Sequence, residues 1–311
     1  MLRVHRPGYH TLVEIESEIA WLRAVHHEGL VSTATIVPDL EGTPVVAVRS
    51  AGGDDRYVTR FTWLDGTEPV GARLVDDFVV LGAVAARLHD HARRWQRPAW
   101  FSRPTWDWAG AIGSTDSAGA GNEAGPGGHW GRWQDGVGVG PAESHLLARL
   151  AAVLRERLAS FGAGPDRFGL IHADMRLANL LVEPDAPPGQ GVHVIDFDDC
   201  GFGWFGYDLA ASLSFIEDSP QVPELTDAWV RGYRSFAPFS AEDEAMLDTF
   251  LLLRRLLLVA WIGSHQDAPY AASLGAGFTR GTCDLAEAYL SARPVTGLGV
   301  GALQRGNKVQ P

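Results

Sequence analysis

The sequence predicts an α+β fold, in which a small segment containing a sheet is followed by a larger, mainly helical segment. Three short apolar runs near the amino end, at residues 2–4, 45–48 and 57–64, are typical of strands. Residues 13–25 carry apolar side chains at helical spacing. The turn signal Asp65-Gly66 ends the last run. We therefore expect a small domain over residues 1–66 and a helical domain over residues 67–292.

Helical patterns dominate the second segment. Apolar residues at helical spacing occupy residues 74–95, 143–161, 207–216, 225–233, 241–264 and 274–290. Residues 99–141 form an insertion rich in Gly, Pro, Ser and Trp. Its tryptophans either pin the insertion onto a helical core or line a substrate pocket. Residues 293–311 carry no such pattern, and we expect them to be a disordered tail.

Composition excludes several classes of protein. The chain of 311 residues has a formal net charge of -12, whereas binding to nucleic acid or anionic lipid needs excess positive charge. No run is apolar enough for a membrane span or a signal peptide. The two cysteines are too few for a disulfide framework. We expect a cytoplasmic protein that handles small molecules or other proteins, and composition does not predict its oligomeric state.

Polar residues interrupt an otherwise apolar region between residues 168 and 195. A predicted strand, 168–171, leads into a polar loop that ends at Asn179, and another strand, 192–195, leads to Asp196. Phosphoryl transfer needs a carboxylate that accepts the hydroxyl proton, and oxygen ligands that hold Mg²⁺ against the phosphates of ATP. Asp174, Asn179 and Asp196 fit this layout, although each residue alone could cap a turn or end a strand.

The stretch from His172 to Asn179, followed by Ile195-Asp196-Phe197-Asp198-Asp199, resembles the catalytic loop of the aminoglycoside phosphotransferase superfamily, whose members are distant relatives of protein kinases. Within it, VIDFDDCGFGWFGYDLA and LRVHRPGYH are most similar to stress response kinase A and homoserine-kinase-like proteins. The resemblance covers about residues 1–290. It implies a two-lobed, protein-kinase-like fold with the active site between the lobes.

The resemblance assigns roles residue by residue. It implies that Asp174 is the catalytic base, that Asn179 and Asp196 bind Mg²⁺, and that His172 orients the loop. Asp198 would support the metal site. Asp208 begins a predicted helix and would cap that helix or brace the catalytic loop.

The same resemblance implies a nucleotide site in the first lobe. A basic residue on the first strand would pair with the phosphates of ATP, and Arg3 must take that place because Lys308 is the only lysine. Its acidic partner would be Glu18, with Glu14 in reserve. Phe61 and Trp63 would lie beside the adenine. The alternatives are that Arg3 and Glu18 are simply solvated.

The resemblance also implies an upstream hairpin that covers the phosphates, and the sequence starts too late to include it. We therefore expect an N-terminally truncated small lobe, either because the start codon is misassigned or because a short form exists. The function expected is a kinase that phosphorylates a hydroxyl of a small amine, an amino acid or a Ser/Thr side chain. A nucleotide-binding pseudokinase or scaffold is the main alternative. A hydrolase that uses Asp196 as nucleophile would leave Asp174 and Asn179 without a role.

Overall fold

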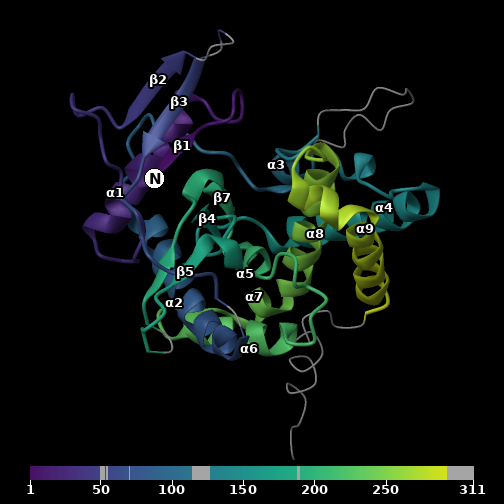
Figure 1. Cartoon of the computed structure of the whole chain (residues 1–311). Coiled ribbons are helices and arrows are strands. Elements are labelled where there is room, and N and C mark those ends of the chain that lie inside the picture. The colour runs from purple at the N-terminus through teal and green to yellow at the C-terminus, as the bar shows by residue number, and fades with distance from the viewer. Residues whose placement is uncertain (50–52, 54, 70, 114–126, 188–189, 293–311) are drawn as a thin grey trace, which may run out of the picture. The chain divides into compact units, whose positions relative to one another are not determined.

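The computed structural model describes residues 1–49, 53, 55–69, 71–113, 127–187 and 190–292 (Figure 1). The expected tail at residues 293–311 and the middle of the Trp-bearing insertion lie outside the described residues. The strands are β1 (Leu2–Val4), β2 (Val45–Arg49), β3 (Asp55–Arg60), β4 (Phe168–Ile171), β5 (Leu180–Val182), β6 (Val192–Val194) and β7 (Gly201–Trp204). The α-helices are α1 (Leu12–His27), α2 (Leu74–Arg94), α3 (Trp108–Ile112), α4 (Pro141–Phe161), α5 (Tyr207–Ser212), α6 (Val222–Arg234), α7 (Ala241–Ala245), α8 (Leu247–Ser264) and α9 (Pro269–Leu290). Short 3₁₀ turns are η1 (Gly71–Arg73), η3 (Trp133–Asp135), η4 (Leu177–Asn179) and η5 (Phe197–Asp199).

The predicted α+β class is confirmed. The predicted helices and strands differ from the observed ones at their ends, and the sequence did not predict β7 or α3. The strand expected over residues 57–64 covers Asp55–Arg60 instead, because the Thr62 N–H leaves β3 to bond the Thr35 carbonyl at 2.9 Å. The helix expected over residues 241–264 is divided between α7 and α8 at Met246. Helix α5 ends at Ser212, four residues before the predicted end. No helix in the described part of the chain combines the length and apolar character needed to cross a bilayer.

The chain forms two compact units, each built from separate stretches of sequence. The first unit combines Met1–Pro104, Gly169–Phe202 and Ala228–Pro238, and the second combines Thr105–Phe168, Gly203–Asp227 and the described residues from Phe239 on. The boundary predicted at Gly66, between residues 1–66 and 67–292, stays a prediction.

The first unit contains an antiparallel sheet with the strand order β1-β3-β2 (Figure 1). Helix α1 covers one face, where Ile15 and Ile19 pack with Val45 and Tyr57. The helix starts at Thr11, whose side chain accepts from the Glu14 N–H while Glu14 bonds back to the Thr11 N–H. This capping box fixes the beginning of α1.

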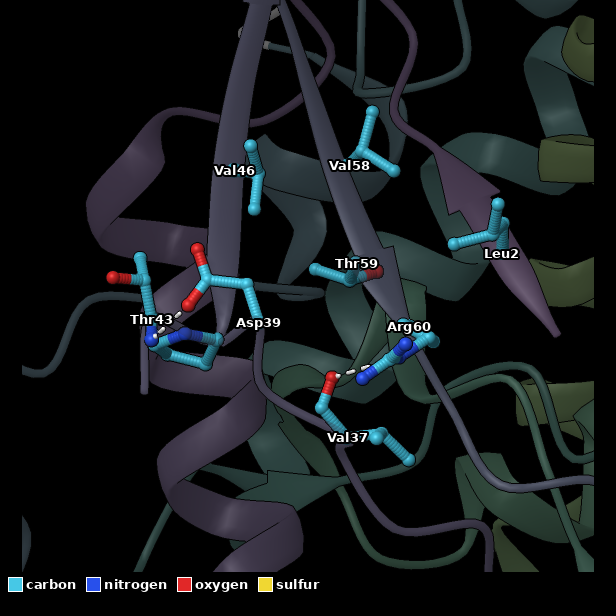
Figure 2. Close-up of a pocket in the computed structure, with 9 residues that line it drawn as sticks. Leu2, Val37, Asp39, Thr43, Val46, Val58, Thr59 and Arg60 are labelled. Carbon is cyan, nitrogen blue, oxygen red and sulfur yellow. Dashed lines mark hydrogen bonds between the residues drawn. The ribbon is translucent and has the colours of Figure 1, made fainter. Parts of the chain in front are cut away.

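The opposite face of the sheet is open and partly apolar. Alternation along the strands turns Leu2, Val46 and Val58 away from α1, and with the segment at residues 37–44 they line a pocket of about 160 Å³ (Figure 2). Asp39 accepts hydrogen bonds from the backbone of that segment, and Arg60 donates to the Pro38 carbonyl at 2.7 Å. These two charged side chains are thus bonded within the protein.

Helix α2 packs tightly against the part of α6 that belongs to the first unit. A Cβ atom on Gly82 would lie 1.9 Å from the carbonyl oxygen of Trp229, and one on Gly232 would lie 1.8 Å from that of Val79. Glycines therefore allow the two backbones to approach, and His89 adds a hydrogen bond to the Tyr233 hydroxyl at 3.1 Å.

The second unit is mainly helical, and α8 lies at its centre. Helices α4, α5 and α9 all pack against α8, which is buried along almost its whole length. Trp106, Trp130 and Trp133 of the insertion are buried in this unit, and the Arg254 guanidinium lies over the Trp130 ring. Their burial supports the interpretation that these three tryptophans pin the insertion onto a helical core.

Candidate active site

The polar loop between β4 and β5 is held by His172. The imidazole Nδ1 of His172 accepts from the Asp174 N–H at 3.3 Å, so its Nε2 carries the proton and donates to the Ile195 carbonyl at 3.1 Å. Ala173 between them has a φ of 67°, which is uncommon for a residue with a Cβ. The fully buried His172 therefore joins the loop to the strand that leads to Asp196.

Asp174 and Asn179 contact each other directly. The Asn179 side-chain amide donates to the Asp174 carboxylate and to the Asp174 carbonyl, both at 2.8 Å. Arg176 donates to the same carboxylate oxygen, Oδ2, at 3.3 Å. Since both bonds of Asn179 use its nitrogen, Oδ1 is the atom left to bind a ligand.

The pairing of β5 with β6 brings Asp196 beside this loop. Leu180 lies opposite Val194 in the antiparallel register, and the next hydrogen bond runs from the Ile195 N–H to the Asn179 carbonyl at 2.9 Å. Asp196 follows at once, with a left-handed backbone (φ 64°, ψ 63°) and a side chain that is 44% exposed. Such a backbone costs on the order of 1 kcal/mol, so surrounding contacts must hold it.

Arg3 links the sheet to α1 and to Asp196. Its guanidinium donates to Glu18 Oε1 and to Asp196 Oδ1, each at 2.7 Å, and lies 4.8 Å above the Phe61 ring. Burial alone would lower the pKa of Arg3, but the carboxylates of Glu18 and Asp196 outweigh burial and raise the pKa. Glu14, the reserve partner in the sequence analysis, instead completes the cap of α1.

Asp198 faces a group of basic side chains on the amino-terminal segment. Its Oδ1 lies 3.5 Å from Arg3 Nη1, 3.6 Å from His5 Nδ1 and 3.8 Å from His10 Nε2. Burial lowers the pKa of both histidines, so the permanent positive charge within this group is that of Arg3.

Asp199 is a carboxyl group that the sequence analysis did not single out. It accepts a hydrogen bond from the Tyr9 hydroxyl at 2.5 Å. Burial, followed by the negative charge of Asp174, raises the pKa of Asp199 to about 7. The segment after Asp196 thus carries a carboxyl group that titrates near neutral pH.

The donor set at this site fits Mg²⁺. Asn179 Oδ1 and the Asp196 carboxylate are hard oxygen donors on adjacent elements, and Mg²⁺ in nucleotide sites takes one or two such protein ligands and completes its shell with phosphate oxygens and water. No group of three or more His, Cys, Asp or Glu side chains among the described residues could hold a metal alone. Asn179 and Asp196 together would supply two protein oxygens and leave the other positions to phosphate oxygens and water.

The remaining predicted residues lie in different environments. Phe61 is buried, and its backbone N–H donates to the Met1 carbonyl at 2.9 Å. Trp63 is 72% exposed and donates from Nε1 to Asp65 at 3.0 Å.

Asp208 lies in the second unit, in the first turn of α5, and the N-cap of that helix is Gly206. Of the two roles expected for Asp208, the helix cap was wrong, because the helix begins one residue before it, and the brace for the catalytic loop stays a prediction.

Four contacts near the loop were missed by the sequence analysis, those of Tyr9, His10, Arg103 and Arg176. Tyr9, His10 and Arg103 come from segments more than 90 residues away along the chain from Asp198 and Asp199, which they contact. Arg103 donates only to backbone carbonyls, which leave no side-chain signal. Arg176 alone had a local signal, since it lies two residues after Asp174.

Comparisons with known proteins identify the family of this chain. The model of the phosphotransferase enzyme family matches residues 1–245. The solved structure of a microcompartment-associated aminopropanol kinase is 46% identical, with a TM-score of 0.82 over 96% of this chain and 86% of that chain. Amicoumacin kinase of Bacillus subtilis (strain 168) is 22% identical over 267 residues, which are 80% of this chain and 68% of that protein. A solved amicoumacin kinase in complex with AMP-PNP and Ca²⁺ is 21% identical, with a TM-score of 0.69 over 91% of this chain and 81% of that chain, and supports the fold alone.

These matches define the class of protein. The chain belongs to the phosphotransferase enzyme family, also called APH, and it has the α+β fold of that family. It is a phosphotransferase, as the sequence predicted.

Proposed function

We propose that this protein is an ATP- and Mg²⁺-dependent kinase that phosphorylates the hydroxyl group of a small amino alcohol. The observation that carries the proposal is the hydrogen bond from Asn179 to the Asp174 carboxylate, together with the pairing of β5 with β6, after which Asp196 follows beside this loop. The acceptor class comes from the 46% identical relative, which is an aminopropanol kinase. We also propose that the finer resemblance to homoserine-kinase-like proteins reflects a related acceptor, a hydroxyl on a small amine.

In the proposed reaction, Asp174 accepts the proton of the acceptor hydroxyl. The hydroxyl oxygen then bonds to the γ-phosphorus of ATP while the bond from that phosphorus to the bridging oxygen breaks, and ADP leaves. The hydrogen bond from Asn179 and the contact with Arg176 hold the Asp174 carboxylate in one orientation. When bound, Mg²⁺ neutralises charge on the phosphates, and Asn179 and Asp196 would hold it.

Arg3 and Glu18 are proposed to serve the nucleotide. Arg3 is permanently charged. Its contacts with Glu18 and Phe61 hold its guanidinium next to the Asp196 side chain. It would give the phosphates a fixed positive group without titrating at physiological pH. We propose that Phe61 and Trp63 lie beside the adenine, and that Asp198 and His172 support the segment that carries Asp196.

The experiment is a phosphate-transfer panel with purified protein, ATP and Mg²⁺. The acceptors are aminopropanol, ethanolamine, homoserine, an aminoglycoside and a generic Ser/Thr protein, with ADP release and product mass as readouts. We expect an amino alcohol to be the best acceptor, and Asp174→Asn to reduce kcat about 10²- to 10⁴-fold, the usual contribution of a general base. The matched variant Asp185→Asn changes an exposed carboxylate of the β5–β6 turn and should leave kcat unchanged.

Two results would contradict the proposal. Transfer to the protein substrate alone would replace the acceptor class. Binding of Mg·ATP with no transfer to any acceptor, unchanged by Asp174→Asn, would favour a nucleotide-binding scaffold.

A further inference from the structure

Arg103 is a buried arginine between α2 and α3 that donates only to backbone. It exposes 5% of its surface and precedes Pro104, which restricts it to an extended backbone. Its Nη1 donates to the Glu14 carbonyl at 2.9 Å and its Nε to the Cys200 carbonyl at 2.6 Å, while its Nη2 donates to the Asp198 carbonyl. One side chain therefore bonds the first turn of α1 and both ends of the segment 198–200.

The backbone on either side of Arg103 makes the same connection. The Ser102 N–H donates to the Ser17 hydroxyl of α1 at 2.9 Å. The Phe202 N–H donates to the Pro104 carbonyl at 2.8 Å. Residues 102–104 are thus bonded to α1 and to the segment after Asp196, and Arg103 is the only side chain of the three that reaches both.

The charge of Arg103 suits this place. Burial would lower its pKa, but the negative charges of nearby carboxylates, those of Glu18 and Asp198 among them, help to outweigh burial and raise the pKa. A planar guanidinium can satisfy three carbonyls that point from different directions, whereas a lysine ammonium cannot reproduce that fork. The site thus requires arginine by geometry as well as by charge.

The segment that Arg103 holds begins with the strained residue Asp196. Its left-handed backbone persists only if neighbouring contacts fix the chain on both sides. On the amino-terminal side the β5–β6 pairing fixes the chain. After Asp196, the hydrogen bonds of Arg103 to the Asp198 and Cys200 carbonyls fix it, and the bond to Glu14 ties it to the helix that carries Glu18.

We propose that Arg103 is a positioning residue for the Mg²⁺ site. It keeps Asp196 at a fixed position relative to α1, so that Arg3 can contact Asp196 and Glu18 together. The proposal rests on the proposed function for the identity of the metal. Arg103 touches no substrate, and its effect should appear as metal affinity before it appears as chemistry.

The test measures Mn²⁺ binding by electron paramagnetic resonance in the presence of AMP-PNP, which needs no turnover. For Arg103→Lys we expect Mn²⁺ affinity to weaken about tenfold or more, the usual cost of losing a partner that orients a metal ligand. For Arg103→Ala we expect added guanidinium to restore part of the affinity. The control Arg255→Lys alters another buried arginine that bonds a backbone carbonyl, in the second unit, and should change Mn²⁺ affinity less than twofold.

A change below about threefold in folded Arg103→Lys would overturn the proposal. If the variants do not fold, hydrogen exchange on the wild-type protein decides. Adding Mn²⁺ and AMP-PNP should slow exchange at Ser102, in the first turns of α1 and at residues 197–202 together. Slowing confined to residues 197–202 would overturn the inference. If Arg103→Lys weakens Mn²⁺ binding as expected but the wild-type protein phosphorylates no acceptor, the proposed function is rejected, and Arg103 is still a positioning residue for the metal.

Discussion

The ion pair between Arg3 and Glu18 should be strongly coupled, because Glu18 is almost fully buried. Glu18 is 1% exposed and Arg3 16%, and the two side chains meet at 2.7 Å. At an effective dielectric constant of about 20, two unit charges about 4 Å apart attract by about 4 kcal/mol. Removing one partner of a buried pair typically costs 3–5 kcal/mol, since the other charge stays buried. Arg3→Gln should therefore lower the free energy of unfolding by about 3 kcal/mol.

The assay is a double-mutant cycle in urea, followed by circular dichroism and fluorescence. Glu18→Gln should cost less than Arg3→Gln, because Arg3 keeps Asp196 at 2.7 Å. The double variant should be less destabilised than the sum of the two single variants by about 2 kcal/mol. Arg23→Gln, at an exposed position of α1, is the control and should stay within about 0.5 kcal/mol of the wild type. Additivity within about 0.5 kcal/mol would show that Arg3 and Glu18 are not coupled.

Three further predictions concern single residues. Because the folded-state pKa of Asp199, about 7, lies above its unfolded value of about 3.9, its contribution to stability is full below pH 4 and is lost as pH rises to 7. In the wild type, this loss should lower the free energy of unfolding by up to about 1.4 kcal/mol per pH unit between pH 4 and 7. Measured in urea, Asp199→Asn should not show this decrease, and the same dependence on pH in both proteins would contradict the prediction. In a magnesium titration, Asn179→Ala should raise the Mg²⁺ concentration needed for half-maximal activity about tenfold. Asn179→Asp keeps an oxygen ligand and should raise that concentration much less. A Gly-to-Ala substitution in an exposed helix usually stabilises it by about 1 kcal/mol. Gly82→Ala should instead lower the urea midpoint of unfolding, since the new Cβ would lie 1.9 Å from the Trp229 carbonyl oxygen.

Helical periodicity predicted the larger elements well. The long amphipathic pattern placed α2 at residues 74–95, and the structure has it at Leu74–Arg94. The break at Met246 was missed, because neither Gly nor Pro marks it and the Ser240 cap of α7 lies well before it. The kink at Gly275, with φ 50°, was also missed because a glycine inside a helical pattern has several outcomes.

At the candidate active site, sequence reasoning singled out Asp174, Asn179 and Asp196, which the fold brings together, and their catalytic and metal-binding roles stay predictions. It missed residues whose partners lie far away along the chain. The spacing from Asp174 to Asn179, and the strand before Asp196, are local signals that phosphoryl transfer requires. Arg103 gave no such signal, since its partners are carbonyl oxygens of residues 14, 198 and 200. Only the folded chain brings these together.

The most direct test of the central claim is the reaction of the purified protein with ATP, Mg²⁺ and aminopropanol, followed by ³¹P nuclear magnetic resonance. If the protein is such a kinase, a new phosphomonoester resonance grows as the γ-phosphate resonance of ATP declines, and the rate for Asp174→Asn is at least about 100-fold lower. Equal rates for Asp174→Asn and the wild type, or loss of the γ-phosphate only to inorganic phosphate, would contradict it.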